Sequence, residues 1–122
     1  MAGKLDAPLL EFDLTKEIAH LHEQAAWREG RGPSSTTLVK HADLRIVLVA
    51  LRAGERMARH RTEARISVHA LEGRIRLSLE GAAAELGPGQ VLVLERELVH
   101  DVEALEDSAF LLTLAWPGGS GP

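Results

Sequence analysis

Two histidines, His60 and His100, are the residues of this sequence whose type and placement could do chemistry. Each lies in a stretch where apolar or small residues alternate with polar ones, on the apolar or small-residue side. Because side chains alternate between the two faces of a strand, both imidazoles are predicted to point into the protein. Neutral imidazole is the commonest protein ligand for divalent transition metals, so the pair could form part of a metal site.

The residues themselves leave a second interpretation open. Stable metal sites generally use three or four protein ligands, and two histidines fall short of that number. Each histidine could instead be a hydrogen-bonded core or pocket-wall residue. His69 could complete a ligand set only if a bulge turned its strand over, because its parity places it opposite Ile66 and Val68.

Other catalytic arrangements are not evident in the sequence. Ser67 and His69 share a strand face, but no acid is placed to orient them as a nucleophile–base pair. The glycines at 87 and 89 flank a proline, and neither a helix nor a lysine follows them as a phosphate-binding loop requires.

The histidines are predicted to be positioned by short strands separated by turns. The stretch 54–73 is typical of a strand, a turn and a second strand, and 99–104 alternates in the same way. In the first of these strands we expect Ala58, His60 and Thr62 to face inward, and Met57, Arg59 and Arg61 to face outward. About eight such strands are predicted after residue 35, a pattern typical of an antiparallel sandwich or barrel.

The N-terminal part of the chain predicts a helix. Asp13 is a suitable N-cap, and an apolar stripe at three- and four-residue steps continues to about Glu29, followed by a loop over 30–35. The stretch 44–51 is apolar on both faces, so it needs cover outside the barrel as well as inside. Either the helix or a second copy of the protein could supply that cover.

Composition limits the possible functions. The chain has 122 residues, 45% of them apolar, which fits one domain. No cysteine is present, which excludes disulfides and thiolate metal sites. No apolar run could span a bilayer and no signal pattern is evident, so we expect a cytoplasmic protein without a membrane partner.

Charge is unevenly distributed along the chain. The net charge is −4 and no basic stripe is interleaved with aromatics, which argues against nucleic acid as a partner. The run 52–65 nevertheless contains five arginines and two glutamates. It predicts either a solvated strand face or a rim that attracts an anionic ligand.

The stretch 54–104 resembles the cupin superfamily of small jelly-roll barrels. The first motif of that family has counterparts in Gly54, His60, Thr62, Ile66 and Gly73, with Thr62 in the place of a histidine and Ile66 in the place of a glutamate. The second motif starts at Gly89 and keeps its histidine as His100; the departures from it are Glu95, Glu97 and Ala104.

The resemblance implies an all-β fold, a double-stranded β-helix or jelly-roll barrel with one N-terminal α-helix. We expect an arm and helix over 1–35, the barrel over 36–117 and a disordered tail over 118–122. The resemblance also implies a homodimer that pairs through the sheet containing the doubly apolar strand at 44–51.

Metal sites of this family are built from three histidines and one glutamate, of which His60 and His100 remain. We therefore expect a small-molecule-binding or regulatory protein with a degraded metal site. The predicted pocket residues are His60, Thr62, Ile66, Val68, His100 and Val102. The alternative is a metal-dependent enzyme, dioxygenase- or isomerase-like, that uses Fe, Ni, Zn or Mn; a third is an accessory protein without a small ligand.

Overall fold

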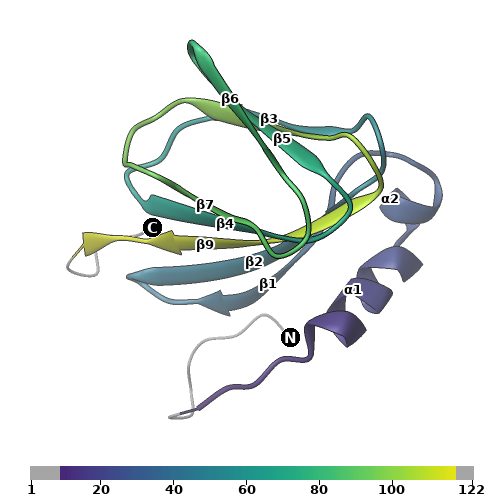
Figure 1. The fold of residues 1–122 in the computed structure, drawn as a ribbon. Coiled ribbons are helices and arrows are strands. Elements are labelled where there is room, and N and C mark those ends of the chain that lie inside the picture. The colour runs from purple at the N-terminus through teal and green to yellow at the C-terminus, as the bar shows by residue number, and fades with distance from the viewer. Residues whose placement is uncertain (1–8, 118–122) are drawn as a thin grey trace.

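The computed structural model describes residues 9–117, and its architecture is two facing antiparallel sheets with a short helical segment outside them (Figure 1). The expected disordered tail at 118–122 and the start of the expected arm, residues 1–8, lie outside the described residues. The elements are α1 (Leu14–Glu23), α2 (Ala25–Arg28), β1 (Ser34–Lys40), β2 (Leu44–Leu51), β3 (Arg56–His60), β4 (Arg65–Glu72), β5 (Ile75–Leu79), β6 (Ala82–Leu86), β7 (Val91–Leu94), β8 (His100–Ala104) and β9 (Ser108–Ala115).

The strands divide into a five-stranded sheet, in the order β1-β2-β9-β4-β7, and a four-stranded sheet, in the order β3-β8-β5-β6. Their facing sides enclose the main core, in which Leu51, Ile75 and Phe110 are fully buried. The predicted jelly-roll barrel with a helix at its N-terminus is therefore confirmed. Neither helix of the described part is long and apolar enough to cross a membrane.

The helical segment differs from the prediction because it is broken. Asp13 caps α1 as expected, and its Oδ1 accepts a hydrogen bond from the Lys16 main-chain N at 3.3 Å. At Gln24 the backbone becomes extended (φ −69°, ψ 147°), so the single helix predicted to reach Glu29 is wrong. After this break the short α2 places Trp27 against the barrel, where it is buried.

Strand β2 is buried on both faces, as its apolar pattern predicts. Val49 and Leu51 point into the barrel core, whereas Leu48 and Ala50 pack in a second core with residues of the helical segment. The second core also contains Ile18, Leu21, Trp27, Leu38, Val39 and Ala109. The helix therefore supplies the outer cover that the sequence requires.

Strand β1 starts earlier than the sequence predicts. β1 begins at Ser34, inside the loop predicted over 30–35, because Ser34 and Ser35 already pair with Ala50 and Val49. Strands β5 and β6 are joined by a tight turn at Glu80 and Gly81, across which Leu79 pairs with Ala82.

Candidate functional site

His60 and His100 lie side by side on neighbouring strands. β3 pairs with β8 in antiparallel fashion, and the two histidines are directly opposite one another in the register. Their ring centroids are 4.3 Å apart and the ring planes are inclined at 61°, an edge-to-face arrangement. Residues that are 40 positions apart in the sequence thus form one imidazole pair.

A bulge, rather than simple alternation, brings His60 opposite His100. Met57 pairs with Val102, and the register shifts between Met57 and His60 by one extra residue on β3. Met57 consequently packs against the barrel core, so the prediction that it faces outward is wrong. Because of the bulge, Met57 and His60 both lie on the inner side of β3, although three positions separate them. Simple alternation therefore predicted the correct side for His60 but did not include the bulge.

The two imidazoles differ in burial. His100 is only 3% exposed, whereas His60 is exposed to solvent. The reason is topological: β8 is an inner strand of the four-stranded sheet, while β3 is its edge and ends at His60. Of the two imidazoles that were predicted to point inward, only His100 is buried, and the pair lies at the border between the core and solvent.

Hydrogen bonds to the main chain orient both rings. Nδ1 of His100 lies 2.9 Å from the carbonyl oxygen of Leu98, and Nδ1 of His60 lies 3.3 Å from that of Ala58. Because a carbonyl oxygen only accepts, Nδ1 donates in each case, and the neutral ring then has its lone pair on Nε2. Each Nε2 can accept a hydrogen bond or bind a metal.

Burial lowers the pKa of His100 below its ordinary value of 6.5, because a charged imidazole loses its hydration in the core. The hydrogen bond to Leu98 and the nearby carboxylate of Asp101 act in the opposite direction, while the charge of His60 adds to the lowering. His100 is therefore neutral at pH 7.

Three of the other predicted pocket residues are buried, and the fourth lies outside the strands. Ile66, Val68 and Val102 are 2%, 1% and 4% exposed and belong to the packed main core. Thr62 lies beyond the end of β3, where its hydroxyl accepts a hydrogen bond from the Ala64 main-chain N at 3.2 Å. That threonine is thus engaged within its own turn and does not share a strand face with His60.

The donor set does not fit the metal site that the cupin resemblance implies. Between residues 9 and 117 no group of three or more His, Asp or Glu side chains could hold an ion. Ile66, in the place of the family's glutamate, has a buried hydrocarbon side chain with no atom that could bind a metal. Two imidazole nitrogens would leave most of the coordination to water or substrate, so no chemical step is assigned to a metal here.

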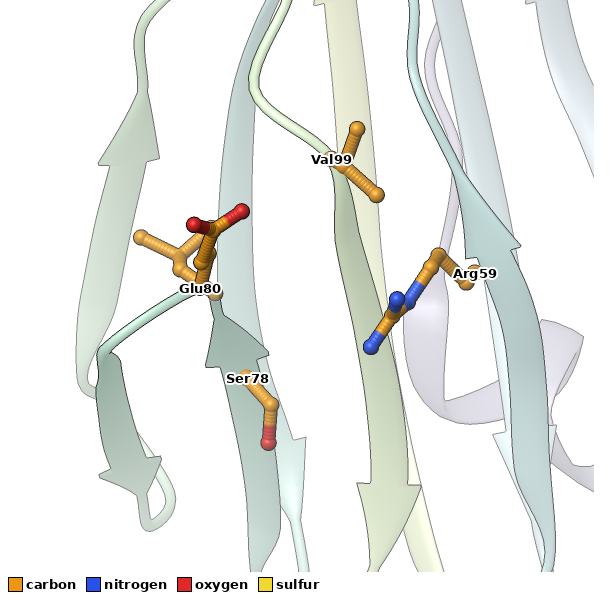
Figure 2. A pocket seen from close by; sticks show the side chains of 5 residues that line it. Arg59, Ser78, Glu80 and Val99 are labelled. Carbon is orange, nitrogen blue, oxygen red and sulfur yellow. The ribbon is translucent and has the colours of Figure 1, made fainter.

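A pocket that the sequence does not predict lies on the outer face of the four-stranded sheet. It has a volume of about 210 Å³ and is lined by Arg59, Ser78, Leu79, Glu80 and Val99 (Figure 2). Ser78 is opposite Asp101 in the register, on the face away from the buried Leu77 and Val102. The pocket therefore does not coincide with the predicted site inside the barrel.

Ion pairs neutralise most of the basic run at 52–65. Four of its five arginines each face a carboxylate: Arg52 pairs with Asp107 at 3.5 Å, Arg56 with Glu103 at 3.1 Å, Arg61 with Glu97 at 3.6 Å and Arg65 with Glu95 at 2.8 Å. Arg59, the fifth, forms no ion pair with another residue of the described range, and it lines the outer pocket. The excess of arginines over glutamates in this run was the available sequence signal for a pocket residue such as Arg59.

Comparisons with known proteins support the fold. No family model matches the chain, and no curated protein matches its sequence. Among solved structures, a conserved protein of unknown function from Streptococcus pyogenes is 27% identical, with a TM-score of 0.67 over 70% of this chain and 75% of that one. A cupin superfamily protein from Desulfitobacterium hafniense is 17% identical, with a TM-score of 0.67 over 69% of this chain and 77% of that one.

An enzyme is also among the similar structures. A point mutant of salicylate 1,2-dioxygenase from Pseudoaminobacter salicylatoxidans is 18% identical, with a TM-score of 0.74 over 85% of this chain. This chain covers only 34% of that enzyme, so the likeness concerns the barrel. Together with the two sheets and their strand order, these matches establish that the protein has the cupin fold.

Proposed function

We propose that this protein binds a small molecule without a resident metal, and that His60 and His100 contact the ligand where the barrel core meets solvent. The observation that supports this proposal is the imidazole pair itself, with ring centroids 4.3 Å apart and both Nδ1 atoms directed at main-chain carbonyl oxygens. A pair oriented in this way offers two Nε2 acceptors to a ligand.

The chemistry of those acceptors suggests the class of ligand. Neutral imidazoles with Nδ1 protonated accept hydrogen bonds from hydroxyl or N–H groups. Buried apolar side chains next to them, such as Val102 and Leu77, favour a ligand that also has an apolar part. We therefore propose a small, uncharged, hydroxyl-bearing ligand.

Thr62, Ile66 and Val68 remain predicted pocket residues. They would contact the ligand if the barrel opens at the histidine pair on binding.

The alternative is a metal-dependent enzyme, dioxygenase- or isomerase-like, in which water or substrate completes the coordination by His60 and His100. The same two Nε2 lone pairs favour it, because they could bind Fe, Ni, Zn or Mn as well as a hydroxyl group. The incomplete ligand set makes it the second choice.

Metal analysis and native mass spectrometry of protein purified without chelators would separate these functions. We expect substoichiometric metal and a copurified small molecule that is lost in His60→Gln and His100→Gln but retained in His69→Gln. His69 is a suitable control because it is half-buried on β4, away from the pair. Stoichiometric metal that disappears in both variants would support the enzyme, and the absence of both metal and small molecule would contradict either proposal.

We further propose a cytoplasmic homodimer that pairs through the five-stranded sheet. Helix α1 covers one part of the outer face of that sheet, but Val91 and Val93 on its edge strand β7 are 54% and 67% exposed. Exposed valines on a flat sheet edge are a common place for two chains to meet.

A further inference from the structure

We propose that the pocket on the outer face of the four-stranded sheet binds a small zwitterion, an α-amino acid with a short aliphatic side chain. This site is separate from the histidine pair and does not depend on the function proposed for it. The inference starts from two charged side chains that line the pocket, Arg59 and Glu80.

Arg59 and Glu80 have opposite charges but do not neutralise one another. Neither forms an ion pair with any residue within 9–117, whereas the other four arginines of the run 52–65 all do. Figure 2 shows Arg59 on one side of the pocket, Glu80 on the other, and Val99 between them. A ligand with a carboxylate at one end and an ammonium at the other would match this arrangement.

The remaining lining residues define the contacts further. Ser78, which projects from β5 on the same face, can donate its hydroxyl proton to a carboxylate beside the guanidinium of Arg59. Val99, which is 41% exposed, supplies aliphatic surface for a hydrocarbon side chain. Asp101, opposite Ser78 on β8, adds a second negative charge near the pocket, which disfavours a dianion such as phosphate.

The size of the pocket agrees with this class of ligand. A volume of about 210 Å³ lies below the roughly 300–1,000 Å³ of pockets that bury drug-sized ligands. Valine is smaller than such a ligand, while a nucleotide or a sugar phosphate is considerably larger than valine. The pocket therefore favours a free amino acid over a larger metabolite.

The test is a titration of the isotope-labelled full chain with L-valine, followed by amide NMR shifts. We expect saturable shifts centred on residues 59, 78–80 and 99, with a Kd on the order of 1 mM. Isovalerate, which is valine without the ammonium, and isobutylamine, which is valine without the carboxylate, should each bind at least about tenfold more weakly.

Variants of the two charged residues complete the test. Arg59→Gln and Glu80→Gln should each weaken L-valine binding at least about tenfold. Arg61→Gln is the matched control, since Arg61 is two residues away and already paired with Glu97, and it should leave the affinity unchanged. The proposal is overturned if L-valine causes no saturable shift, if isovalerate binds as tightly as L-valine, or if neither variant weakens L-valine binding.

Discussion

At the scale of single residues, His100 shows how burial sets the chemistry of a side chain. Its ring is almost fully buried, and the loss of hydration lowers its pKa below the ordinary 6.5. The neutral ring donates from Nδ1 to Leu98 and keeps Nε2 as an acceptor.

We predict that stability falls as the pH drops below about 6.5. Because the pKa of His100 is lower in the folded state, the unfolded chain binds its proton first, and unfolding becomes easier between the unfolded and folded values. Urea unfolding at several pH values between 5 and 8 measures the effect. His100→Gln should flatten this dependence relative to the wild type; an equally steep decline in the variant would show that other groups cause it.

Gly73 illustrates a position that only glycine can occupy. Its φ is +74°, and a Cβ added there would overlap the carbonyl oxygen of Asp107 and the hydroxyl of Ser108. Ser108 in turn is buried, accepts from the Arg74 main-chain N at 3.0 Å and lies 3.1 Å from the Arg74 carbonyl oxygen. The close approach therefore holds the β4–β5 turn against the start of β9.

We expect Gly73→Ala to lower the free energy of unfolding by about 3 kcal/mol or more, since it combines backbone strain with overlap against main-chain atoms. Gly81→Ala is the matched control. Gly81 has a similar φ of +76° but no atom within 4 Å of an added Cβ, so only the strain remains, at about 1–2 kcal/mol. Chemical denaturation compares the two, and equal losses would mean that the overlap is relieved by a small shift.

At the scale of elements, the helical segment is attached to the barrel by a layered contact. His22 stacks on Trp27 with ring centroids 4.1 Å apart, and the guanidinium carbon of Arg52 lies 4.5 Å from the centroid of the Trp27 ring. Nε of Arg52 also donates to the Trp27 carbonyl oxygen at 2.9 Å. This arginine of the basic run therefore has a structural role.

Arg52→Lys is expected to destabilise the protein by about 1–2 kcal/mol, because lysine retains the charge but loses the planar stack and the Nε hydrogen bond. Thermal unfolding and limited proteolysis near residues 24–30 measure the loss. Among the described residues, Arg61 pairs only with the exposed Glu97, so Arg61→Lys should change stability by less than about 0.5 kcal/mol. A similar loss in both variants would contradict a specific role for the stack.

At the scale of the whole molecule, the two faces of the five-stranded sheet have different cover. The inner face belongs to the main core, and the outer face is covered by α1 and α2 over β2 and its neighbours. The helix thus removes the original reason to expect a second copy over β2. What remains for the proposed homodimer is the edge strand β7 with Val91 and Val93.

For the proposed dimer, light scattering at micromolar concentration should give twice the mass of the 13.2 kDa chain. Val93→Lys places a charge on the exposed edge and should shift the protein toward the monomer, because a buried unpaired lysine is costly at an interface. Leu105→Lys, at another exposed apolar position outside the sheet, is the control. A monomeric wild type would refute the proposal.

The resemblance to the cupin superfamily predicted the barrel correctly, and local sequence patterns predicted the capped start of the helix and the double burial of β2. These follow from local periodicity, turn residues and motif spacing, which are properties of neighbouring positions in the chain.

The remaining features depend on contacts between distant parts of the chain. The break at Gln24, the bulge between Met57 and His60, the exposure of His60 on an edge strand and the outer pocket depend on which strands become neighbours. The pairing of four arginines with distant carboxylates, which leaves Arg59 without an ion pair in the described part of the chain, depends on the same contacts. Periodicity within one strand has no information about the register of its partner, and that register sets burial, ion pairing and the shape of a pocket.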